Sequence, residues 1–252
     1  MFWNHFLYRP REIRMKKSVK ILGVRVDNLS RDGIQGWIKK ALDNEPRQKF
    51  IATLNPEIIL GARRDENYKN ILNSADLSLC DGFGIKFMFF LKGKKIIARY
   101  TGVELTDYLL SLAKEKNRNV LVVAGKNSLS GPEEIRRGIE DKYNFSVQAG
   151  YIGEIFSDAD AAENAEIVFV NFGAPEQEKF IFENRKKFPK AKVLVGVGGT
   201  FDFLTGKMKR APKLMRKAGL EWLFRLVQEP KRLKRIIDAT VVFPFLAIFN
   251  SE

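Results

Sequence analysis

The chain has 252 residues, 45% of them hydrophobic, so it can bury a sizeable core and fits one large α/β domain with an appendage. Its single cysteine, Cys80, and single histidine, His5, argue against a disulfide framework, a histidine-rich zinc site and a Ser-His-Asp triad. The net charge of +14 calls for an anionic partner, which is nucleic acid, a membrane surface or a phosphorylated substrate.

The N-terminal segment does not have the order of a signal peptide. Its aromatic residues precede its charges, and no long apolar core or small-residue cleavage site follows. The stretch MKKSVKILGV from Met15 is typical of an ordinary cytosolic start. We therefore predict that residues 1–18 are an extension of an α/β core formed by residues 19–218.

Strand and helix patterns alternate through this core. Ser30 is a plausible cap for the first helix, and Asn55 with Pro56 suits the N-cap and first position of the next. Thr101 and Glu104 have the spacing of a capping box. The predicted strands are Val19–Val26, Phe50–Leu54, Leu77–Cys80, Val120–Ala124, Phe145–Ala149, Ile167–Phe172 and Val193–Val197. The predicted helices are Asp32–Leu42, Phe83–Leu91, Leu105–Lys116, Pro132–Tyr143 and Pro175–Phe188.

This alternation predicts a largely parallel sheet with helices on both faces. In open sheets of this kind, ligands bind outside the carboxyl ends of the strands. Any one polar residue there could be only a helix cap or a turn, but their convergence on one edge predicts a binding site. The small or polar residues that follow the strands are Thr53, Asn55, Asp81, Gly82, Gly125, Asn127, Asn171, Gly173, Gln177, Gly198, Gly199 and Asp202.

Asp81 interrupts the otherwise apolar stretch ADLSLCDGFGI at the predicted end of a strand. No helix start or lysine adjoins it, so the pattern alone supports a functional role as well as a structural one. Cys80 lies in the apolar run and is interpreted as a core thiol. Asp158 and Asp160 are spaced like a metal-binding pair, but they fit the acidic start of a helix better, and we predict no metal site.

The glycine-rich stretch GVGGTF, residues 196–201, is weak evidence for a dinucleotide cofactor. It lacks the full GxGxxG spacing, and the usual dinucleotide-binding helix does not follow it. We therefore expect no cofactor.

The C-terminal region, residues 219–252, is predicted to be a basic, amphipathic appendage. The apolar run Ile236–Phe249 is shorter than the roughly 20 residues that a spanning helix needs, and Pro244 interrupts it. We therefore expect the appendage to lie on an anionic membrane surface without crossing it, the alternative being an amphipathic helix packed on the core. Its apolar stripe is formed by Trp222, Leu223, Leu226 and Val227.

Basic residues dominate the stretch from Lys207 to Arg235, where the only acids are Glu221 and Glu229. Pro230 is predicted to start a second helix that carries two of these bases, Arg232 and Arg235, on neighbouring faces.

Six motifs in order along the chain resemble those of the WecG/TagA/CpsF glycosyltransferases, and the resemblance covers nearly the whole chain after residue 18. It implies a Rossmann-like enzyme at the cytoplasmic face of the membrane, peripheral on its inner side. The motifs are TLNPEII at 53–59, ADLSLCDGFGI at 75–85, RYTGVELT at 99–106, GAPEQEKF at 173–180, GVGGTFDFLTGKMKRAP at 196–212 and EWLFRLVQEPKRLKR at 221–235.

The resemblance also implies an activity and its site residues. An enzyme of this family transfers an N-acetylmannosamine-type sugar from UDP to polyprenyl-diphosphate-linked N-acetylglucosamine, which in the wall teichoic acid branch gives the disaccharide linkage unit. By this similarity Asp81 is the general base. The other implied roles are a sugar pocket of Thr53, Asn55, Arg99 and Gln177, a uridine end at Asn127 and Asp202, and arginines that fold over the site, Arg225, Arg232 and Arg235.

The residues fit this chemistry without the resemblance. An acceptor hydroxyl becomes a good nucleophile when a positioned carboxylate takes its proton, and Asp81 could be that base. Displacement on an α-linked UDP-sugar inverts the anomeric centre, and arginine is the better candidate to stabilise the departing diphosphate in a chain without a credible set of metal ligands.

Several alternatives stay open at this point. The donor could carry N-acetylmannosaminuronic acid, and the exact acceptor and the oligomeric state, including a homo-oligomer, are not fixed. A basic nucleic-acid-binding module would use the same C-terminal region, but no recognition helix, RNP or zinc-finger pattern accompanies it, so we expect no nucleic acid partner. A Rossmann-type methyltransferase or dehydrogenase is compatible with the fold alone.

Overall fold

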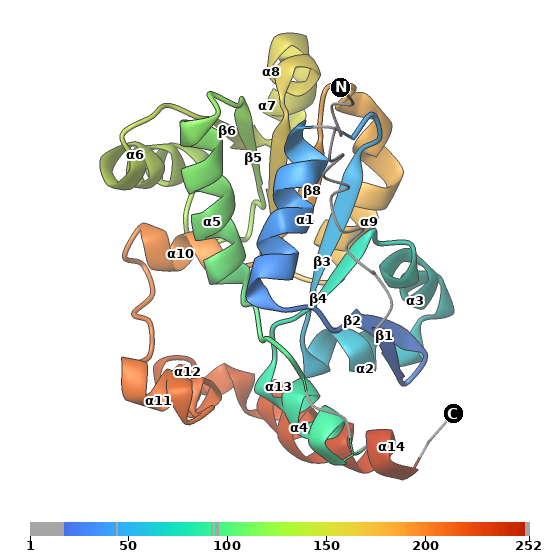
Figure 1. The fold of residues 1–252 in the computed structure, drawn as a ribbon. Helices are drawn as coiled ribbons and strands as arrows, with labels where there is room; N and C mark the ends of the chain where they lie inside the picture. Colours follow the sequence, from blue (N-terminus) through green and yellow to red (C-terminus); the bar gives the residue numbers. More distant parts are fainter. Residues whose placement is uncertain (1–17, 44, 92, 94–95, 250–252) are drawn as a thin grey trace, which may run out of the picture.

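The computed structural model describes residues 18–43, 45–91, 93 and 96–249. Its centre is a six-stranded sheet with the strand order β4-β3-β8-β7-β5-β6, and every pair of neighbours within it is parallel (Figure 1). The predicted parallel sheet is confirmed. Its strands are β3 (Lys49–Leu54), β4 (Leu77–Cys80), β5 (Val120–Ala124), β6 (Gln148–Tyr151), β7 (Ile167–Asn171) and β8 (Val193–Gly196).

Two hydrophobic clusters cover the two faces of this sheet, because successive strand residues point in opposite directions. In β3, Phe50 and Ala52 belong to one cluster and Ile51 to the other. The second cluster contains α1 (Arg31–Asp43), α5 (Gly102–Glu115), α6 (Pro132–Tyr143) and α10 (Thr200–Leu204). The first contains α2 (Pro56–Arg64), α3 (Glu66–Asn73), α4 (Phe83–Leu91), α7 (Ile152–Ser157), α8 (Ala159–Asn164), α9 (Glu176–Asn184) and α14 (Phe243–Phe249).

The predicted helix starts are present. The Oγ atom of Ser30 accepts a hydrogen bond from the Gly33 amide at 3.0 Å, and Asn55 caps α2 by accepting from the Ile58 amide at 3.0 Å. Thr101 and Glu104 form the capping box of α5. Asp158 caps α8, which confirms its interpretation as a helix-start acid.

The prediction of one strand over Val19–Val26 is wrong. Leu22 and Gly23 both have positive φ, 49° and 79°, and form a tight turn between β1 (Ser18–Ile21) and β2 (Val24–Asp27). These two strands pair as an antiparallel ribbon separate from the main sheet. The Asp27 carboxylate accepts a hydrogen bond from the Ser78 amide at 2.8 Å, so the ribbon covers the exposed edge of β4.

The strand predicted at Phe145–Ala149 begins later, at Gln148. Asn144 ends α6 in the left-handed conformation, with φ of 55°, and the next three residues return the chain to the sheet. The helix predicted at Pro175–Phe188 is also shorter, because α9 ends at Asn184 and a 3-10 turn, Arg185–Lys187, follows.

The C-terminal region is helical and packs against the core, running along one end of the molecule (Figure 1). Pro230 begins a 3-10 turn, Pro230–Arg232, that leads directly into α13, as predicted. Phe243 is 0% exposed and joins the cluster that includes α2 and α4. No helix among the described residues is long and apolar enough to cross a membrane. The elements of this region are α11 (Lys213–Lys217), α12 (Glu221–Gln228), α13 (Leu233–Ile237), a π turn (Asp238–Val242) and α14.

Candidate active site

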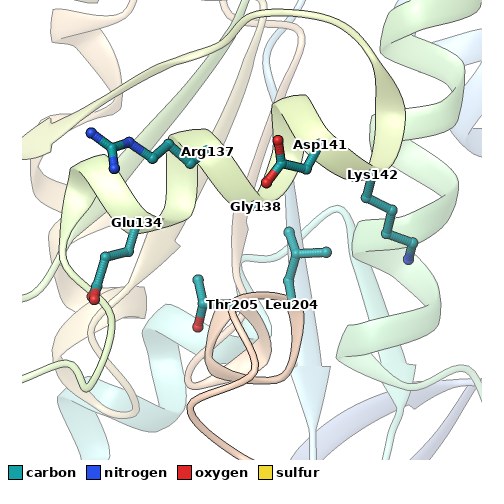
Figure 2. A pocket seen from close by; sticks show the side chains of 7 residues that line it. All are labelled: Glu134, Arg137, Gly138, Asp141, Lys142, Leu204 and Thr205. Carbon is teal, nitrogen blue, oxygen red and sulfur yellow. The ribbon is translucent and has the colours of Figure 1, made fainter.

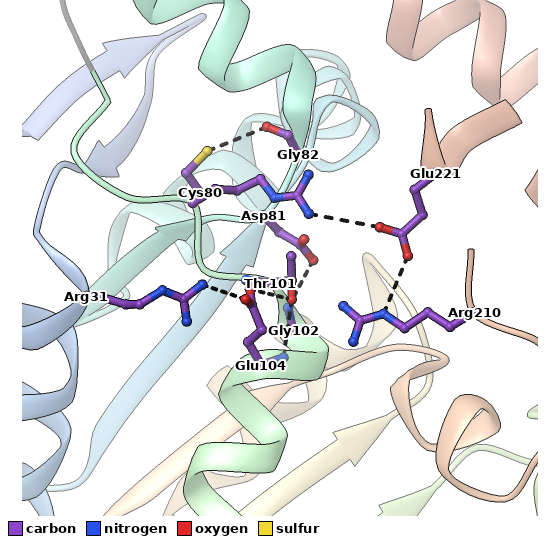
Figure 3. Close-up of polar contacts among 10 residues, drawn as sticks. Arg31, Cys80, Asp81, Gly82, Thr101, Gly102, Glu104, Arg210 and Glu221 are labelled. Atoms are coloured by element: carbon purple, nitrogen blue, oxygen red, sulfur yellow. Dashed lines mark hydrogen bonds and ion pairs between the residues drawn. The ribbon is translucent and has the colours of Figure 1, made fainter. Parts of the chain in front are cut away.

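Asp81 lies directly after β4, at the carboxyl edge of the sheet. Its amide donates to the carbonyl of Leu54 at 2.8 Å, which ties it to the end of β3. Its Oδ2 atom accepts a hydrogen bond from the amide of Gly102, at the first turn of α5, at 3.2 Å (Figure 3). The carboxyl group is therefore fixed between β3, β4 and the start of α5.

Gly82 allows the close approach that forms this corner. A β-carbon at this position would lie 2.5 Å from Cδ of Pro56 and 3.2 Å from Cα of Asn55. Only glycine fits without displacing the start of α2. The glycine after Asp81 thus lets the end of β4 pack directly against Asn55 and Pro56 at the start of α2.

Burial is the main influence on the Asp81 carboxyl group, and it raises the pKa. The Gly102 amide and the charges of Arg99 and Arg225 act in the opposite direction, while the charge of Glu221 adds to the rise. A carboxylate whose pKa is raised is a stronger base than an ordinary one, and such groups gather at functional sites.

Cys80 precedes Asp81 and is buried. Burial, with a smaller effect from the neighbouring Asp81 charge, raises the pKa of the thiol to about 12. The group therefore stays protonated at neutral pH, which confirms its interpretation as a core thiol.

Thr53 and Gln177 lie on either side of Gly196, the last residue of β8. The Thr53 hydroxyl donates to the Gly196 carbonyl at 3.2 Å, and a β-carbon on Gly196 would lie 2.7 Å from the Gln177 side chain. Gln177 also accepts a hydrogen bond from the Gly198 amide at 2.8 Å. Both side chains are buried, so they fix the start of the glycine-rich loop from its buried side.

A buried relay fixes the orientation of Gln177, and sequence reasoning did not single it out. The Gln177 amide nitrogen donates to Glu178 at 2.7 Å, and the Tyr68 hydroxyl donates to the other Glu178 oxygen at 2.9 Å. Burial raises the pKa of Glu178, while these two donors lower it. The sequence offered one indication of this role for Glu178, because it is the second acidic residue of the GAPEQEKF motif and directly follows Gln177.

Arg99 and Arg225 are near enough to Asp81 for the charge of each to lower its pKa, and the Arg225 guanidinium lies over the ring of Phe203, 5.0 Å from its centre. Figure 3 shows two further charged residues there that the sequence analysis did not assign, Arg210 and Glu221. Glu221 lies 4.0 Å from Arg99 and 3.8 Å from Arg210.

Arg232 and Arg235 are held by other carboxylates. Arg232 donates to Glu229 at 2.6 Å within its own turn, and Arg235 donates to Glu57 at 2.9 Å. Glu57 lies in the first turn of α2, two residues after Asn55, so Arg235 ties α13 to the end of the helix that borders the site.

Asn127 and Asp202 lie further along the same edge of the sheet. Asn127 is exposed in the turn after β5, whereas Asp202 is buried and accepts hydrogen bonds from the Ser130 amide at 3.1 Å and hydroxyl at 2.7 Å. Between them, Asn171 ends β7 with a buried side-chain amide whose nitrogen and oxygen have no hydrogen-bond partner among the residues that the structure describes. Buried amides of this kind are normally satisfied by water or a ligand.

A hollow of about 410 Å³ lies elsewhere, between α6 and α10 (Figure 2). None of its lining residues belongs to the predicted site. In the part of the chain that the structure describes, no three His, Cys, Asp or Glu side chains are grouped so that they could hold a metal ion. The lining residues are Glu134, Arg137, Gly138, Asp141, Lys142, Leu204 and Thr205.

Taken together, the fold and this edge define a Rossmann-like α/β protein with a candidate ligand site at the carboxyl ends of parallel strands. At that site a carboxylate with a raised pKa faces several arginines, an arrangement suited to a phosphorylated substrate.

The chain belongs to the glycosyl transferase WecG/TagA/CpsF family, whose profile matches residues 19–251. Three relatives are each named N-acetylglucosaminyldiphosphoundecaprenol N-acetyl-beta-D-mannosaminyltransferase. The protein from Bacillus subtilis (strain 168) is 35% identical over 80% of both chains, and that from Bacillus spizizenii is 37% identical over 75% of both. The protein from Staphylococcus aureus (strain MRSA252) is 30% identical over 87% of this chain and 88% of its own.

Proposed function

We propose that this protein is an inverting, metal-independent glycosyltransferase that moves N-acetylmannosamine from UDP to polyprenyl-diphosphate-linked N-acetylglucosamine, the linkage unit of wall teichoic acid. The observation that carries the proposal is the partly buried Asp81 carboxyl group at the carboxyl edge of the sheet, close enough to Arg99 and Arg225 for their charges to lower its pKa. The names of the three relatives, which match 75% or more of this chain, support it.

In this mechanism Asp81 takes the proton from the acceptor hydroxyl as that oxygen attacks the anomeric carbon. The raised pKa of Asp81 makes the carboxylate a better proton acceptor, and such a base contributes a factor of about 100 to 10,000 in rate. The bond from the sugar to UDP breaks on the opposite face, so the configuration inverts. Arg99 and Arg225 stabilise the negative charge that develops on the leaving diphosphate.

The donor lies along the carboxyl edge of the sheet. Its sugar is placed near Thr53, Asn55 and Gln177, and its uridine near Asn127 and Asp202. The unpartnered amide of Asn171 supports the uridine end, because a polar base or an ordered water there would satisfy it. Arg235 contributes by holding α13 beside α2 through its bond to Glu57, whereas Arg232 braces its own turn through Glu229.

The protein acts as a peripheral protein on the cytoplasmic face of the cell membrane, where a polyprenyl acceptor is anchored. Large apolar side chains are exposed on α12, α13 and α14, and the exposed face continues onto α4, which α14 contacts. Basic residues of the same region, including Lys231 and Lys234, are exposed and suit an anionic leaflet. The exposed apolar residues include Phe87, Phe90, Trp222, Val227, Phe245 and Phe249.

Purified full-length protein tests this function when it is incubated with UDP-N-acetylmannosamine and a short-chain polyprenyl-diphosphate N-acetylglucosamine. We expect a β-linked disaccharide product and activity that survives EDTA. The uronic acid form of the donor is the matched alternative substrate. No product from either donor would contradict the proposal, and activity lost on chelation but restored by magnesium would contradict its metal-independent form.

A further inference from the structure

Glu221, in the first turn of α12, lies between two arginines that come from distant parts of the chain. One of its oxygens is 4.0 Å from Arg99 and the other is 3.8 Å from Arg210 (Figure 3). Both distances exceed the 2.7–3.2 Å range of an N–H···O hydrogen bond. The Glu221 carboxylate therefore interacts with the charges of Arg99 and Arg210 without making a hydrogen bond to Nη2 of Arg99 or Nε of Arg210.

The arginines around Glu221 have unused hydrogen-bond donors. The Nε atoms of Arg210, Arg216 and Arg225 are all buried and have no hydrogen-bond partner among the described residues. Buried donors without acceptors cost free energy, and those of charged groups cost the most. Three such atoms in one region suit the binding of an acceptor with several oxygens.

The charges of the cluster are also unbalanced. Arg216 and Arg210 are close enough for the charge of Arg216 to lower the pKa of Arg210, an effect second only to burial. The carboxylates that act on Arg210 are Glu221, Glu104 and Asp81, in order of effect. Glu104 is already paired with Arg31, and Asp81 already accepts the Gly102 amide. A group with two or more negative charges would balance the charges of Arg99, Arg210, Arg216 and Arg225 better than Glu221 does alone.

We propose that Glu221 is a stand-in anion, which occupies the place of the leaving diphosphate between Arg99 and Arg210 until the nucleotide displaces it. Arg210 and Arg216 then bind the diphosphate together with Arg99 and Arg225. This inference rests on the proposed function and adds three residues to its site. Because Glu221 begins α12, nucleotide binding also releases a contact that holds α12 over Asp81.

The test compares UDP with uridine, because only UDP carries the diphosphate. Affinities of the full-length protein for both are measured by calorimetry at low ionic strength. Glu221→Gln removes the competing charge and keeps the shape, so it should bind UDP about five- to tenfold more tightly than wild type. Arg210→Gln should weaken UDP binding by about tenfold. Neither change should alter uridine binding.

Lys207→Gln is the matched control, since it also removes one positive charge from the same loop. Lys207 pairs with Glu134 on the surface, at 2.7 Å, with both side chains more than 40% exposed. The Lys207→Gln variant should leave the ratio of the UDP and uridine affinities at its wild-type value. A ratio that fell equally in Lys207→Gln and Arg210→Gln would show only a general charge effect and overturn the assignment of Arg210.

Weaker or unchanged UDP binding in Glu221→Gln would overturn the stand-in role and make Glu221 a structural clamp for α12. If that variant is too unstable to measure, Arg210→Gln and Arg216→Gln decide, because an unchanged ratio in both contradicts the diphosphate site. Failure of the proposed function looks different: the wild-type protein would bind no UDP or transfer no sugar. A wild-type protein that binds UDP but shows no change in the variants disproves this inference alone.

Discussion

At the scale of single residues, Asp81 combines a cost in stability with a gain in reactivity. Burial raises its pKa, so the folded protein holds a proton on this group more tightly than the unfolded chain does. As pH rises from the ordinary pKa of an aspartate to the raised value, the wild-type protein therefore loses stability, and above that window the loss is complete. Above this window the ionised base is available for catalysis at the expense of folding free energy.

Asp81→Asn should therefore separate the two properties. The amide keeps the size of the side chain but cannot take a proton, so turnover should fall by about 100- to 10,000-fold while UDP affinity is retained. Above the pH at which Asp81 ionises in the folded protein, the melting temperature of the variant should exceed that of wild type, because a partly buried charge is removed. Calorimetry and a transfer assay measure both. Asp160→Asn, on an exposed helix start, is the control, and wild-type turnover in Asp81→Asn would rule out the base.

The buried hydrogen bonds that join Tyr68, Glu178 and Gln177 should contribute measurably to the free energy of unfolding. Tyr68→Phe removes the donor of a 2.9 Å bond to Glu178, whose carboxylate is 1% exposed, and should lower the free energy of unfolding by about 1 to 3 kcal/mol. Urea denaturation measures this. Tyr143→Phe removes a comparable bond to Asp107 at the surface and should cost less than about 1 kcal/mol. Equal effects would mean that the relay adds nothing beyond a surface contact.

At the scale of secondary structure elements, the start of α2 has a structural role and, in the proposal, a role in binding. Asn55 caps the helix through the Ile58 amide, and the glycine after Asp81 packs against the same residue. A capping residue can therefore line a site without a loss of helix stability.

Two substitutions of Asn55 should distinguish these roles. Asn55→Ala loses the cap and should lower stability by about 1 kcal/mol. Asn55→Asp keeps a good cap, so its stability should match wild type, but its added negative charge beside Asp81 should reduce transfer activity. Thermal melts and initial rates compare the two variants. An Asn55→Asp variant with full activity would show that Asn55 serves only as a cap.

The packing of α14 predicts unequal effects for two neighbouring phenylalanines. Phe243 is fully buried against the core, so Phe243→Ala should cost about 3 to 5 kcal/mol, whereas Phe245 is 60% exposed and Phe245→Ala should change stability by less than about 0.5 kcal/mol. Denaturant titration without lipid measures both. If Phe243→Ala were neutral, α14 would not be docked on the core in the absence of a membrane.

At the scale of the whole molecule, charge and exposed apolar area lie in the same region. The net charge of +14 is concentrated toward the C-terminal part of the chain, and the exposed phenylalanines of α4 and α14 lie in that part of the fold. Each base near an anionic leaflet contributes on the order of 1 kcal/mol of binding free energy. The combination favours peripheral docking.

Full-length protein should therefore float with anionic phosphatidylglycerol vesicles and not with purely zwitterionic ones. Because charged contacts are screened, binding should weaken as salt is raised from about 0.05 to 0.5 M. Replacing the exposed Phe90 and Phe245 by serine should reduce flotation while the melting temperature stays near that of wild type. Equal binding to both kinds of vesicle would exclude the electrostatic part of this proposal.

The sequence by itself predicted the strands of the parallel sheet, several helices and their caps, and the edge at which we propose the site. Strand β4 and helix α4 have the predicted bounds, and the caps at Asn55 and Thr101 are present, because these features depend on side chains a few residues apart. The position of Asp81 after a buried strand was also readable, since parallel strands place their carboxyl ends on one edge.

Only the tertiary structure decided which distant residues meet. The turn at Leu22 and Gly23 requires positive φ angles, which the apolar pattern of the surrounding sequence does not indicate. For this reason the segment predicted as one strand folds as two antiparallel strands. Tyr68 and Glu178 are 110 residues apart in the chain, and Glu221 reaches Arg99 only because the appendage packs beside α4. Local sequence patterns specify helices and strands. Contacts between these elements depend on how their surfaces pack together, and a single sequence does not show that packing.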